Sequence, residues 1–400
     1  MRIAFVLGSV HISGGNYVVV QHAMHAAACG HDVFLVILYR FQPQDLAWHS
    51  GLAHLKLIHI DDIGGQRFDL AVATWWKTAL ELYRLDARQY AYFVQSIESR
   101  FFDASDVSLR RLVDSTYELR LPGVTEAQWI QQYLAETYGS RYLLARNGIR
   151  KDLYTIDGPC HAPRARGTLR VLVEGPMGVP IKNTARTLRI VRRASVGEAW
   201  LLTSTSLAWH PGVRRLFSKI PIHEVAKVYR SCDVIVKLSL VEGMFGPPLE
   251  MFHCGGTAIV YAVSGHDEYI RHGHNALVAN MHDEAAVLRH LRQLRDDSSL
   301  LDRLKAGARE TADAWPGWPE SSAVFTAQLE ALCDGELVSR EWLSIETARI
   351  RREFVKELPP SVPSVDRLQG RSGLSVSISR LKDRVRPFSS LLGYIADGYR

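Results

Sequence analysis

Residues 233–255 read DVIVKLSLVEGMFGPPLEMFHCG, and the order of residue types in this stretch decides the fold. An apolar run comes first, then a loop with Gly243 and Gly246, then a segment that begins with Pro247 and Pro248. A short continuous apolar run is typical of a parallel strand buried on both faces. Proline suits the first turn of a helix, where no N–H is needed. The stretch therefore predicts a strand, a glycine loop and a helix.

The same alternation extends in both directions from this stretch. The other predicted strands are IAFVLG (3–8), HDVFLVILY (31–39), FDLAVATWW (68–76), QYAYFVQS (89–96), TLRVLVEG (168–175), EAWLLTST (198–205) and TAIVYAV (257–263). Helical patterns between them cover residues 17–30, 125–139, 183–194 and 222–232. Alternating strands and helices predict a parallel sheet covered on both faces. A linker rich in Pro, Gly and Arg, residues 157–167, separates two such runs, so we expect two doubly wound α/β domains.

Composition and charge exclude several classes of protein. The chain has 400 residues, of which 47% are hydrophobic and 22% charged, as in ordinary globular proteins. Its five cysteines never lie at CxxC spacing, which argues against a disulfide framework and a zinc site. The formal charge of +6 suits an anionic ligand, but basic residues are not interleaved with aromatic ones, so no nucleic-acid partner is expected. The N-terminus lacks a signal-peptide pattern, so we expect a cytoplasmic protein.

Two carboxylates lie on either side of the glycine loop. Glu242 follows the predicted strand, and Glu250 is predicted to lie in the first helical turn. The backbone amides of Phe245 and Gly246 are expected to point out of the helix N-terminus, where anions bind. Two carboxylates that accept hydrogen bonds from hydroxyl groups, with an anion site between them, match the order of groups in a nucleotide sugar: sugar hydroxyls, diphosphate and ribose hydroxyls. The alternative is an ordinary connection in which the helix dipole alone favours a glutamate.

The stretch from residue 222 to 278 resembles the C-terminal domain of family 4 glycosyltransferases. The resemblance depends on Glu242 and Glu250 with seven residues between them, on Cys254 and Gly255, and on the acidic pair at 267–268. It runs from about residue 168 to 290 and is weaker over the N-terminal half. It implies a retaining enzyme of the GT-B architecture, with two facing Rossmann-like domains and an interdomain cleft.

The resemblance also implies domain boundaries. It gives an N-terminal acceptor domain over residues 1–150 and a nucleotide-sugar donor domain over residues 151–317. Residues 318–358 are expected to form helices that cross back to the N-terminal domain. Residues 359–400 are predicted to form a linker and a basic amphipathic tail. That tail would contact an anionic inner membrane surface or dock against the N-terminal domain, and Pro387 weakens the membrane interpretation.

Carried over by position, the resemblance assigns roles to the donor-site residues. Glu242 would bind hydroxyls of the donor sugar and Glu250 those of the ribose. Phe245 and Gly246 would give backbone amides to the sugar or phosphate. In the N-terminal half, Gly14 and Gly15 match the glycine pair that lines the donor phosphates. The alternative for these two glycines is a tight turn.

The stretch VEGPMGVPIKN, residues 173–183, departs from the family pattern. Lys182 matches the lysine that neutralises the leaving diphosphate, but the arginine expected before it is replaced by Pro176. Asn183 is assigned to the donor site, with capping of the following helix as its other interpretation. Arg186 is a nearby cation, and its position in a helix is equally typical of a solvent-facing residue.

The stretch YFVQSIESRFF, residues 92–102, is similar to a pattern of bacterial rhamnosyltransferase-like members of this family. The similarity puts Gln95 on the acceptor side and makes Glu98 a catalytic candidate, while Ser96 replaces an acidic residue. The alternative is that both side chains bond loop backbone. Rhamnose is therefore one expected donor sugar.

The resemblance implies sugar transfer from a dTDP-, UDP- or GDP-linked donor to a glycan or lipid-linked acceptor, with retention at the anomeric carbon. Glu242, Lys182 and Glu98 are the catalytic candidates, and no metal or other cofactor is expected. Two other functions stay open: a non-catalytic nucleotide-sugar-binding partner protein, which Pro176 favours, and a sugar-nucleotide 2-epimerase.

Overall fold

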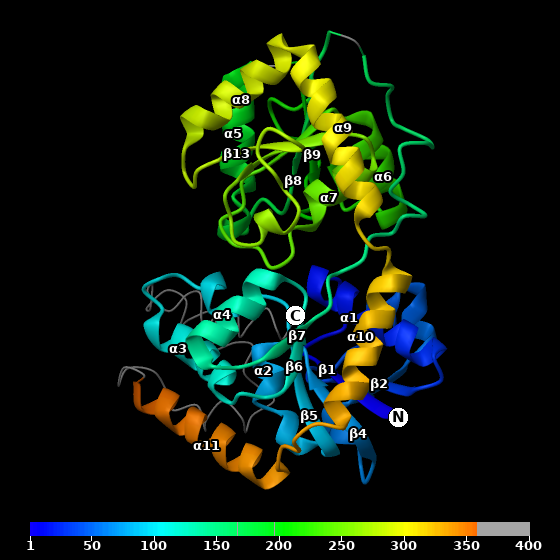
Figure 1. Ribbon diagram of the computed structural model, residues 1–400, viewed down its shortest axis with the longest axis vertical. Coiled ribbons are helices and arrows are strands. Elements are labelled where there is room, and N and C mark those ends of the chain that lie inside the picture. Colours follow the sequence, from blue (N-terminus) through cyan, green and yellow to red (C-terminus); the bar gives the residue numbers. More distant parts are fainter. Residues whose placement is uncertain (166, 196, 358–400) are drawn as a thin grey trace. The chain divides into compact units, whose positions relative to one another are not determined.

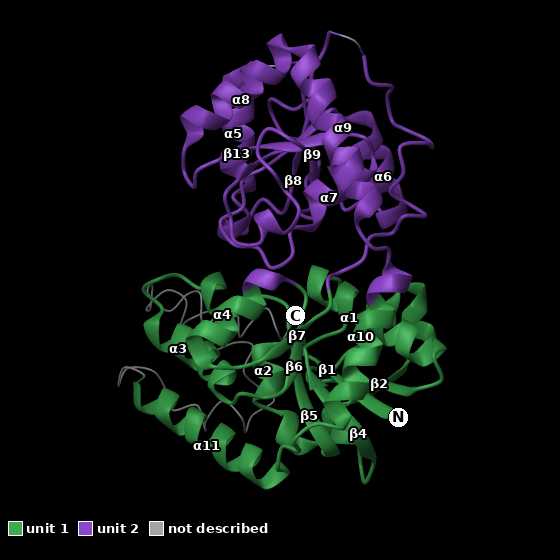
Figure 2. Cartoon of the chain, viewed as in Figure 1, with its two compact units in different colours: residues 1–126, 130–145, 322–400 green, residues 127–129, 146–321 purple. Residues whose placement is uncertain are grey.

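The computed structural model describes residues 1–165, 167–195 and 197–357 (Figure 1). The chain divides into two units (Figure 2). The first unit contains Met1–Glu126, Ile130–Ala145 and the described residues from Ser322 onward. The second unit contains Ala127–Trp129 and Arg146–Ser321.

The first unit is built on a parallel sheet with strand order β3-β2-β1-β4-β5-β6-β7. Its strands are β1 Arg2–Leu7, β2 Asp32–Ile37, β3 Lys56–His59, β4 Arg67–Ala73, β5 Asp86–Val94, β6 Gly123–Thr125 and β7 Tyr142–Leu144. The strand order changes direction at β1, with β2 on one side and β4 on the other. In open α/β sheets, ligands bind beyond the carboxyl ends of the strands at such a switch point.

The second unit repeats this arrangement with strand order β10-β9-β8-β11-β12-β13, again with parallel pairs. Its strands are β8 Arg170–Glu174, β9 Glu198–Thr203, β10 Arg215–Ser218, β11 Val234–Lys237, β12 Thr257–Tyr261 and β13 Ala276–Ala279. Alternate strand residues enter different core clusters. Leu172 packs with residues of α6, α7 and α9, whereas Val171 and Val173 pack with residues of α5 and α8. Both faces of the sheet are therefore covered.

The helices follow the predicted alternation. Their bounds are α1 Gly14–Ala28, α2 Trp76–Ala79, α3 Val107–Glu118, α4 Gln128–Tyr138, α5 Thr184–Ala194, α6 Ile222–Ser231, α7 Gly246–His253, α8 Glu284–Asp296, α9 Ser298–Ala314, α10 Trp318–Cys333 and α11 Arg340–Glu357. Gly30 and Gly139 follow the ends of α1 and α4 with φ of +89° and +66°. Such left-handed backbone favours glycine at the end of a helix, as predicted.

Two doubly wound parallel sheets confirm the predicted α/β fold class. Strands β3, β6, β7, β10 and β13 and helices α2 and α3 were not predicted from the sequence. These strands have only three or four residues, too few to show an apolar pattern. The predicted strand at 233–240 is shorter in the structure, because β11 ends at Lys237.

Helix α10, late in the chain, packs into the core of the first unit. The Phe325 ring is fully buried and stacks on His22 of α1, with 4.0 Å between ring centroids. Its centroid lies 4.8 Å from that of Phe93 in β5. Burial lowers the pKa of His22 to about 3, helped by the nearby His25, so the imidazole stays neutral in this stack. Residues about 300 positions apart therefore share one core.

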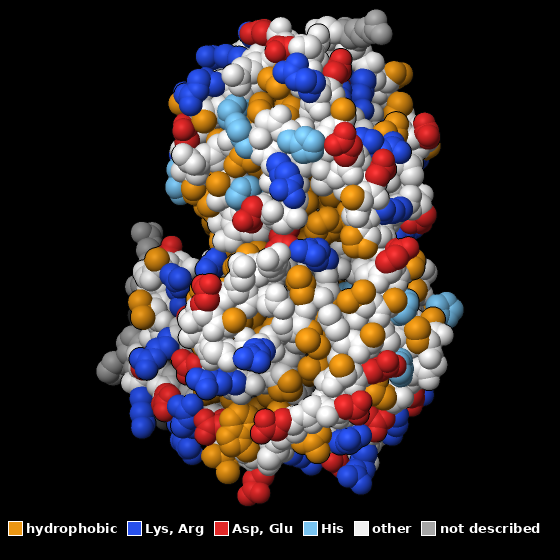
Figure 3. Space-filling model, viewed as in Figure 1, with side chains coloured by type: hydrophobic (Ala, Val, Ile, Leu, Met, Phe, Trp, Pro, Cys, Tyr) orange, Lys and Arg blue, Asp and Glu red, His pale blue; other side chains and the backbone are white. Residues whose placement is uncertain are grey.

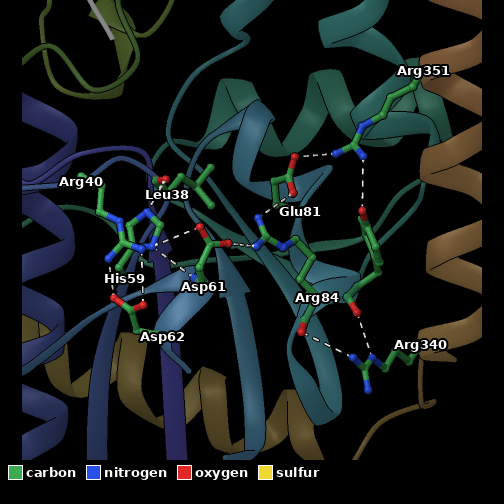
Figure 4. A network of polar contacts seen from close by, with 10 residues as sticks. Leu38, Arg40, His59, Asp61, Asp62, Glu81, Arg84, Arg340 and Arg351 are labelled. Atoms are coloured by element: carbon green, nitrogen blue, oxygen red, sulfur yellow. Dashed lines mark hydrogen bonds and ion pairs between the residues drawn. The ribbon is translucent and has the colours of Figure 1, made fainter. Parts of the chain in front are cut away.

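A chain of polar contacts fastens α11 to the first unit (Figure 4). The Arg351 guanidinium lies 2.6 Å from the Glu81 carboxylate, and Glu81 is 3.4 Å from Arg84. Arg84 in turn pairs with Asp61. Near the start of the helix, Arg340 donates to the Arg84 carbonyl oxygen at 3.4 Å. Partly exposed ion pairs contribute at most about 1 kcal/mol each, so these contacts mainly orient the helix.

The predicted linker and basic tail at 359–400 lie outside the described residues. Within residues 1–357, leaving out 166 and 196, no helix is long and apolar enough to span a bilayer. Figure 3 shows basic and acidic side chains interspersed over the visible face of each unit.

Replacing Phe325 by alanine should destabilise the first unit by about 3–5 kcal/mol, because it leaves a cavity beneath the His22 and Phe93 rings. Urea denaturation followed by tryptophan fluorescence measures this change. The matched control is Val324→Ala, since Val324 is 49% exposed on the same helix and should change stability by less than about 0.5 kcal/mol. Equal effects of the two substitutions would contradict the packing described.

Candidate functional site

Two charged residues end neighbouring strands of the second sheet. Glu174 is the last residue of β8 and Lys237 the last of β11, and these strands pair in parallel. Side chains alternate between faces, so Glu174 lies on the same face as Leu172 and Lys237 on the same face as Ile235. Both of those leucine and isoleucine side chains belong to the core cluster that contains α6 and α7. The two charged side chains are therefore directed to one face and form an ion pair.

The Lys237 ammonium is buried, with its side chain only 4% exposed. Burial lowers the pKa of Lys237, but the carboxylates of Glu174 and Glu242 outweigh this effect and the pKa is raised overall. Lys237 also donates to the Glu174 carbonyl oxygen at 3.4 Å. A permanently charged ammonium therefore lies at the carboxyl edge of the sheet.

Glu250 faces the same group of charges from helix α7. Burial raises the pKa of its carboxyl group to about 7, and the neighbouring Glu174 carboxylate adds to this rise. Hydrogen bonds with Tyr229 and Tyr154, and the charge of Lys237, act in the opposite direction. The Glu250 carboxyl group therefore keeps its proton to a higher pH than an exposed glutamate does.

Lys182 and Glu242 form the second ion pair of this edge. The Lys182 Nζ atom lies 2.8 Å from Glu242 Oε2, and the Glu242 side chain is 6% exposed. The other carboxylate oxygen, Oε1, is buried and has no hydrogen-bond partner among the described residues. The structure therefore brings together the predicted Lys182 and Glu242, and it leaves one carboxylate oxygen able to accept a ligand hydroxyl.

The predicted anion site at the start of α7 is only partly present. The Gly246 N–H donates to the Met244 carbonyl oxygen at 3.1 Å, so the prediction of a free Gly246 amide is wrong. Phe245 has φ of −86° and ψ of 76°, the conformation of an inverse γ-turn, which explains this contact. The Phe245 side chain is fully buried, and its carbonyl oxygen accepts a hydrogen bond from the Tyr269 hydroxyl.

Two other predictions need correction. Helix α7 begins at Gly246 and has no acidic residue in its first turn, so Glu250 lies beyond that turn. The Asn183 side chain does not cap α5 but donates to the Leu238 carbonyl oxygen at 2.9 Å. Asn183 has left-handed backbone with φ of +55°, which turns its amide toward the segment that follows β11. Arg186 pairs with Glu284 at 2.5 Å on the protein surface.

In the first unit, Gly14 and Gly15 are the first two residues of α1, and Ser13 caps this helix by accepting from the Asn16 N–H. Gly15 lies close to Gln95, because a Cβ atom on Gly15 would be 3.3 Å from Gln95 Oε1. Gln95 also donates to the Thr74 carbonyl oxygen at 3.4 Å. The carboxyl ends of β1, β4 and β5 therefore meet at Gly15 and Gln95, while Gly14 is exposed.

The Glu98 side chain bonds to loop backbone, as the alternative interpretation of this residue expected. Its carboxylate accepts from the Trp76 N–H at 2.8 Å and from the Tyr92 hydroxyl at 3.4 Å. The residue is 8% exposed, and burial raises the pKa of its carboxyl group to about 8. Its backbone N–H donates to Tyr117. The Glu98 side chain is therefore part of the loop structure, and its catalytic role stays a prediction.

The sequence analysis missed Glu174, Lys237, Thr184 and Ser239. A lysine and a glutamate at the ends of otherwise apolar strands were the available signal, since such residues are seldom buried without a partner. Thr184 and Ser239 carry no sequence signal, and only the structure shows that their hydroxyl groups are buried without a partner among the described residues. Among residues 1–165, 167–195 and 197–357, no three His, Cys, Asp or Glu side chains are grouped so that they could hold a metal ion.

Comparisons with known proteins agree with this geometry. Residues 214–311, which include the Glu242 loop, match the family described as "Glycosyl transferases group 1". The chain is 27% identical over 251 residues to the O-antigen biosynthesis protein RfbC of Myxococcus xanthus, which covers 60% of this chain and 19% of that protein. It is 28% identical over 162 residues to a D-inositol 3-phosphate glycosyltransferase of Streptomyces bingchenggensis, which covers 40% and 32%. The chain thus spans less than a third of the length of both curated relatives.

Solved structures extend the likeness to the fold. Sucrose-phosphate synthase of Thermosynechococcus elongatus superposes with a TM-score of 0.69 at 16% identity, over 84% of this chain and 100% of that one. HepE of Anabaena, solved in complex with UDP-glucose, superposes with a TM-score of 0.65 at 14% identity, over 83% and 100%. These likenesses show that the chain has the GT-B fold.

The buried carboxyl group of Glu98 should make stability depend on pH. In the unfolded chain its pKa is the ordinary 4.5, so the folded state binds the proton more tightly. The stabilisation of the folded state by this proton is complete below pH 4.5 and is lost as the pH rises toward 8. Its full size is roughly 1.4 kcal/mol for each unit by which the folded and unfolded pKa values differ.

Glu98→Gln removes this titration, so between pH 5 and pH 8 the variant should lose about 3–4 kcal/mol less stability than the wild type. Urea denaturation at both pH values measures the difference. Parallel losses in the two proteins would show that Glu98 does not hold its proton in the folded state.

Proposed function

From a glycosyl transferases group 1 domain on a GT-B fold, we propose that this chain is a retaining glycosyltransferase of polysaccharide biosynthesis. It moves a sugar from a nucleotide-diphosphate donor to a glycan or lipid-linked acceptor. The observation that carries the proposal is the edge of the second sheet, where Lys182 pairs with one carboxylate oxygen of Glu242 and the other, Oε1, has no hydrogen-bond partner among residues 1–357, leaving out 166 and 196. An ammonium for a leaving phosphate and an acceptor for sugar hydroxyls are the groups that such a transfer requires.

In the proposed reaction, the bond between the anomeric carbon and the β-phosphate oxygen breaks, and its electron pair stays on that oxygen. The acceptor hydroxyl oxygen bonds to the anomeric carbon on the same face, and its proton leaves with the diphosphate. Lys182 stabilises the charge on the leaving group, Glu242 orients the sugar through its free oxygen, and Glu250 accepts the ribose hydroxyls. The Lys182 ammonium group and backbone amide groups would stabilise the negative charge of the leaving diphosphate, so we propose a reaction that does not need a metal ion.

The first unit would bind the acceptor. Gln95 lies at the carboxyl edge of its sheet and offers an amide group to a polar acceptor, and it lies beside Gly15, which the resemblance assigns to the donor phosphates. Glu98 would act as a positioning residue, because its bond to the Trp76 N–H holds the loop after β4. RfbC of Myxococcus xanthus is named for O-antigen biosynthesis, which supports a cell-surface glycan as the product class.

The identity of the donor is a finer proposal. HepE was solved with UDP-glucose, which supports a nucleotide-diphosphate sugar as the donor class. The pattern at Gln95 and Glu98 favours a rhamnose donor such as dTDP-rhamnose.

A non-catalytic nucleotide-sugar-binding protein is the second candidate. The observation that favours it is Pro176, which lies at the start of the loop after β8, where the resemblance implies a diphosphate-binding arginine. Release of free nucleoside diphosphate in the presence of an acceptor distinguishes the two, because a binding protein releases none. An epimerase would turn over its donor without an acceptor.

The decisive experiment measures binding of UDP-, GDP- and dTDP-sugars, dTDP-rhamnose included, to the wild type and to Glu250→Gln by calorimetry. One donor should bind the wild type and bind the variant about 10- to 100-fold more weakly, the usual contribution of hydrogen bonds to a charged group. The amide keeps the size of the side chain, so the core around Tyr229 should stay folded.

Glu284→Gln is the matched control. Glu284 lies in the same unit but pairs with Arg186 and Arg193 at the surface, and its variant should bind the donor like the wild type. If no sugar nucleotide binds the wild type, the transferase proposal fails.

A further inference from the structure

The backbone after β8 packs closely against two polar side chains at Gly175. This glycine has φ of +140°, and a Cβ atom placed on it would lie 2.5 Å from Thr184 Oγ1 and 3.7 Å from Lys237 Nζ. A side chain would therefore collide with the threonine hydroxyl. A hydroxyl donor and an ammonium group converge on backbone at the carboxyl edge of the sheet, where α/β proteins bind their ligands.

Several polar atoms of Thr184 and of the segment that follows β11 are buried and have no hydrogen-bond partner among the described residues. Thr184 is 2% exposed, Ser239 is fully buried, and the hydroxyl oxygens of both lack a hydrogen-bond partner among the described residues. Glu242 Oε1 is in the same situation. Unsatisfied buried polar atoms cost free energy in the empty protein, and a ligand with several oxygens would satisfy the two hydroxyl donors.

The charged groups at the carboxyl edge of the second sheet do not by themselves favour binding of a diphosphate, because carboxyl groups outnumber ammonium groups. Glu174, Glu242 and Glu250 supply three carboxyl groups, and Lys182 and Lys237 supply two ammonium groups. Lys182 already pairs with Glu242. A diphosphate that enters here therefore needs an ammonium group in addition to Lys182, and Pro176 supplies none.

We propose that Lys237 is the second cation of the donor site, and that it binds the leaving diphosphate together with Lys182 and the Thr184 hydroxyl. The inference rests on the proposed function and adds a residue to it. A lysine on a flexible four-carbon stem can exchange its bond with Glu174 for a phosphate oxygen without a change in the backbone. In the transfer step it stabilises the electron pair left on the β-phosphate oxygen.

A purely structural role is the competing explanation, in which Lys237 only neutralises the buried Glu174. The double variant Glu174→Gln with Lys237→Met separates the two, because it removes both charges and leaves no unpaired one. Calorimetry on the full chain compares UDP, dTDP and GDP with the corresponding monophosphates. The double variant should lose about 10- to 100-fold in affinity for the preferred diphosphate and keep its affinity for the monophosphate.

Lys305→Met is the matched control for this pair. Lys305 pairs with Asp233 at 2.7 Å at the opposite, amino end of strand β11. Its loss should leave the affinity for the diphosphate unchanged. A double variant that melts like the wild type and retains its full preference for the diphosphate overturns the inference, while the proposed function stands. A wild type that binds no nucleotide overturns both.

A second variant gives a test that does not depend on the buried pair. Pro176→Arg alters a partly exposed loop residue and introduces the missing arginine. In the wild type it should change diphosphate affinity little, because Lys237 already supplies the charge, and in the double variant it should restore the lost affinity. A gain of about tenfold or more in the wild type would show that the site lacks a second cation and that Lys237 does not act as one.

Discussion

The ion pair between Lys237 and Glu174 is the interaction on which the edge of the second sheet depends. Carboxyl groups of Glu174, Glu242 and Glu250 gather there, and like charges that are buried together destabilise a fold unless cations compensate them. The ammonium group of Lys237 provides this compensation from within the sheet. Burial alone would lower its pKa, and the surrounding carboxylates reverse that effect. The edge is therefore polar, charged and closely packed at once.

The same constraint explains why the candidate site is divided between strand ends and loops. Parallel strands bring Glu174 and Lys237 together by register, which requires no particular loop conformation. Lys182 and Glu242 lie in loops, and their positions depend on special backbone such as the left-handed Asn183. The rigid strand ends position the charged side chains of Glu174 and Lys237, and the loops position Lys182 and Glu242, which are proposed to contact a ligand.

The first unit shows how a late segment completes an early fold. Phe325 of α10 stacks on His22 and packs against Phe93, so residues from both ends of the described chain form one core. In this unit Gly15 and Gln95 lie together, and Glu98 is directed into the protein and bonds to the Trp76 N–H. The sequence motif at residues 92–102 could not show which way the Glu98 carboxyl group points, because that direction depends on contacts with the distant Trp76 backbone.

The sequence by itself determined the parallel α/β class, because apolar strands and helical patterns alternate regularly enough to identify both sheets. It also gave Lys182, Glu242 and Glu250 as candidates, because the resemblance depends on motif spacing; the structure shows that Lys182 and Glu242 form an ion pair, and the roles of all three residues stay predictions. Short strands such as β6 and β13 escaped detection, because three or four residues carry too little pattern. Only the tertiary structure decided which polar groups are paired: it occupied the Gly246 amide, turned Asn183 toward Leu238, and placed Lys237 beside Gly175. Hydrogen bonds and ion pairs depend on distances between segments far apart in the chain, and no local pattern encodes those distances.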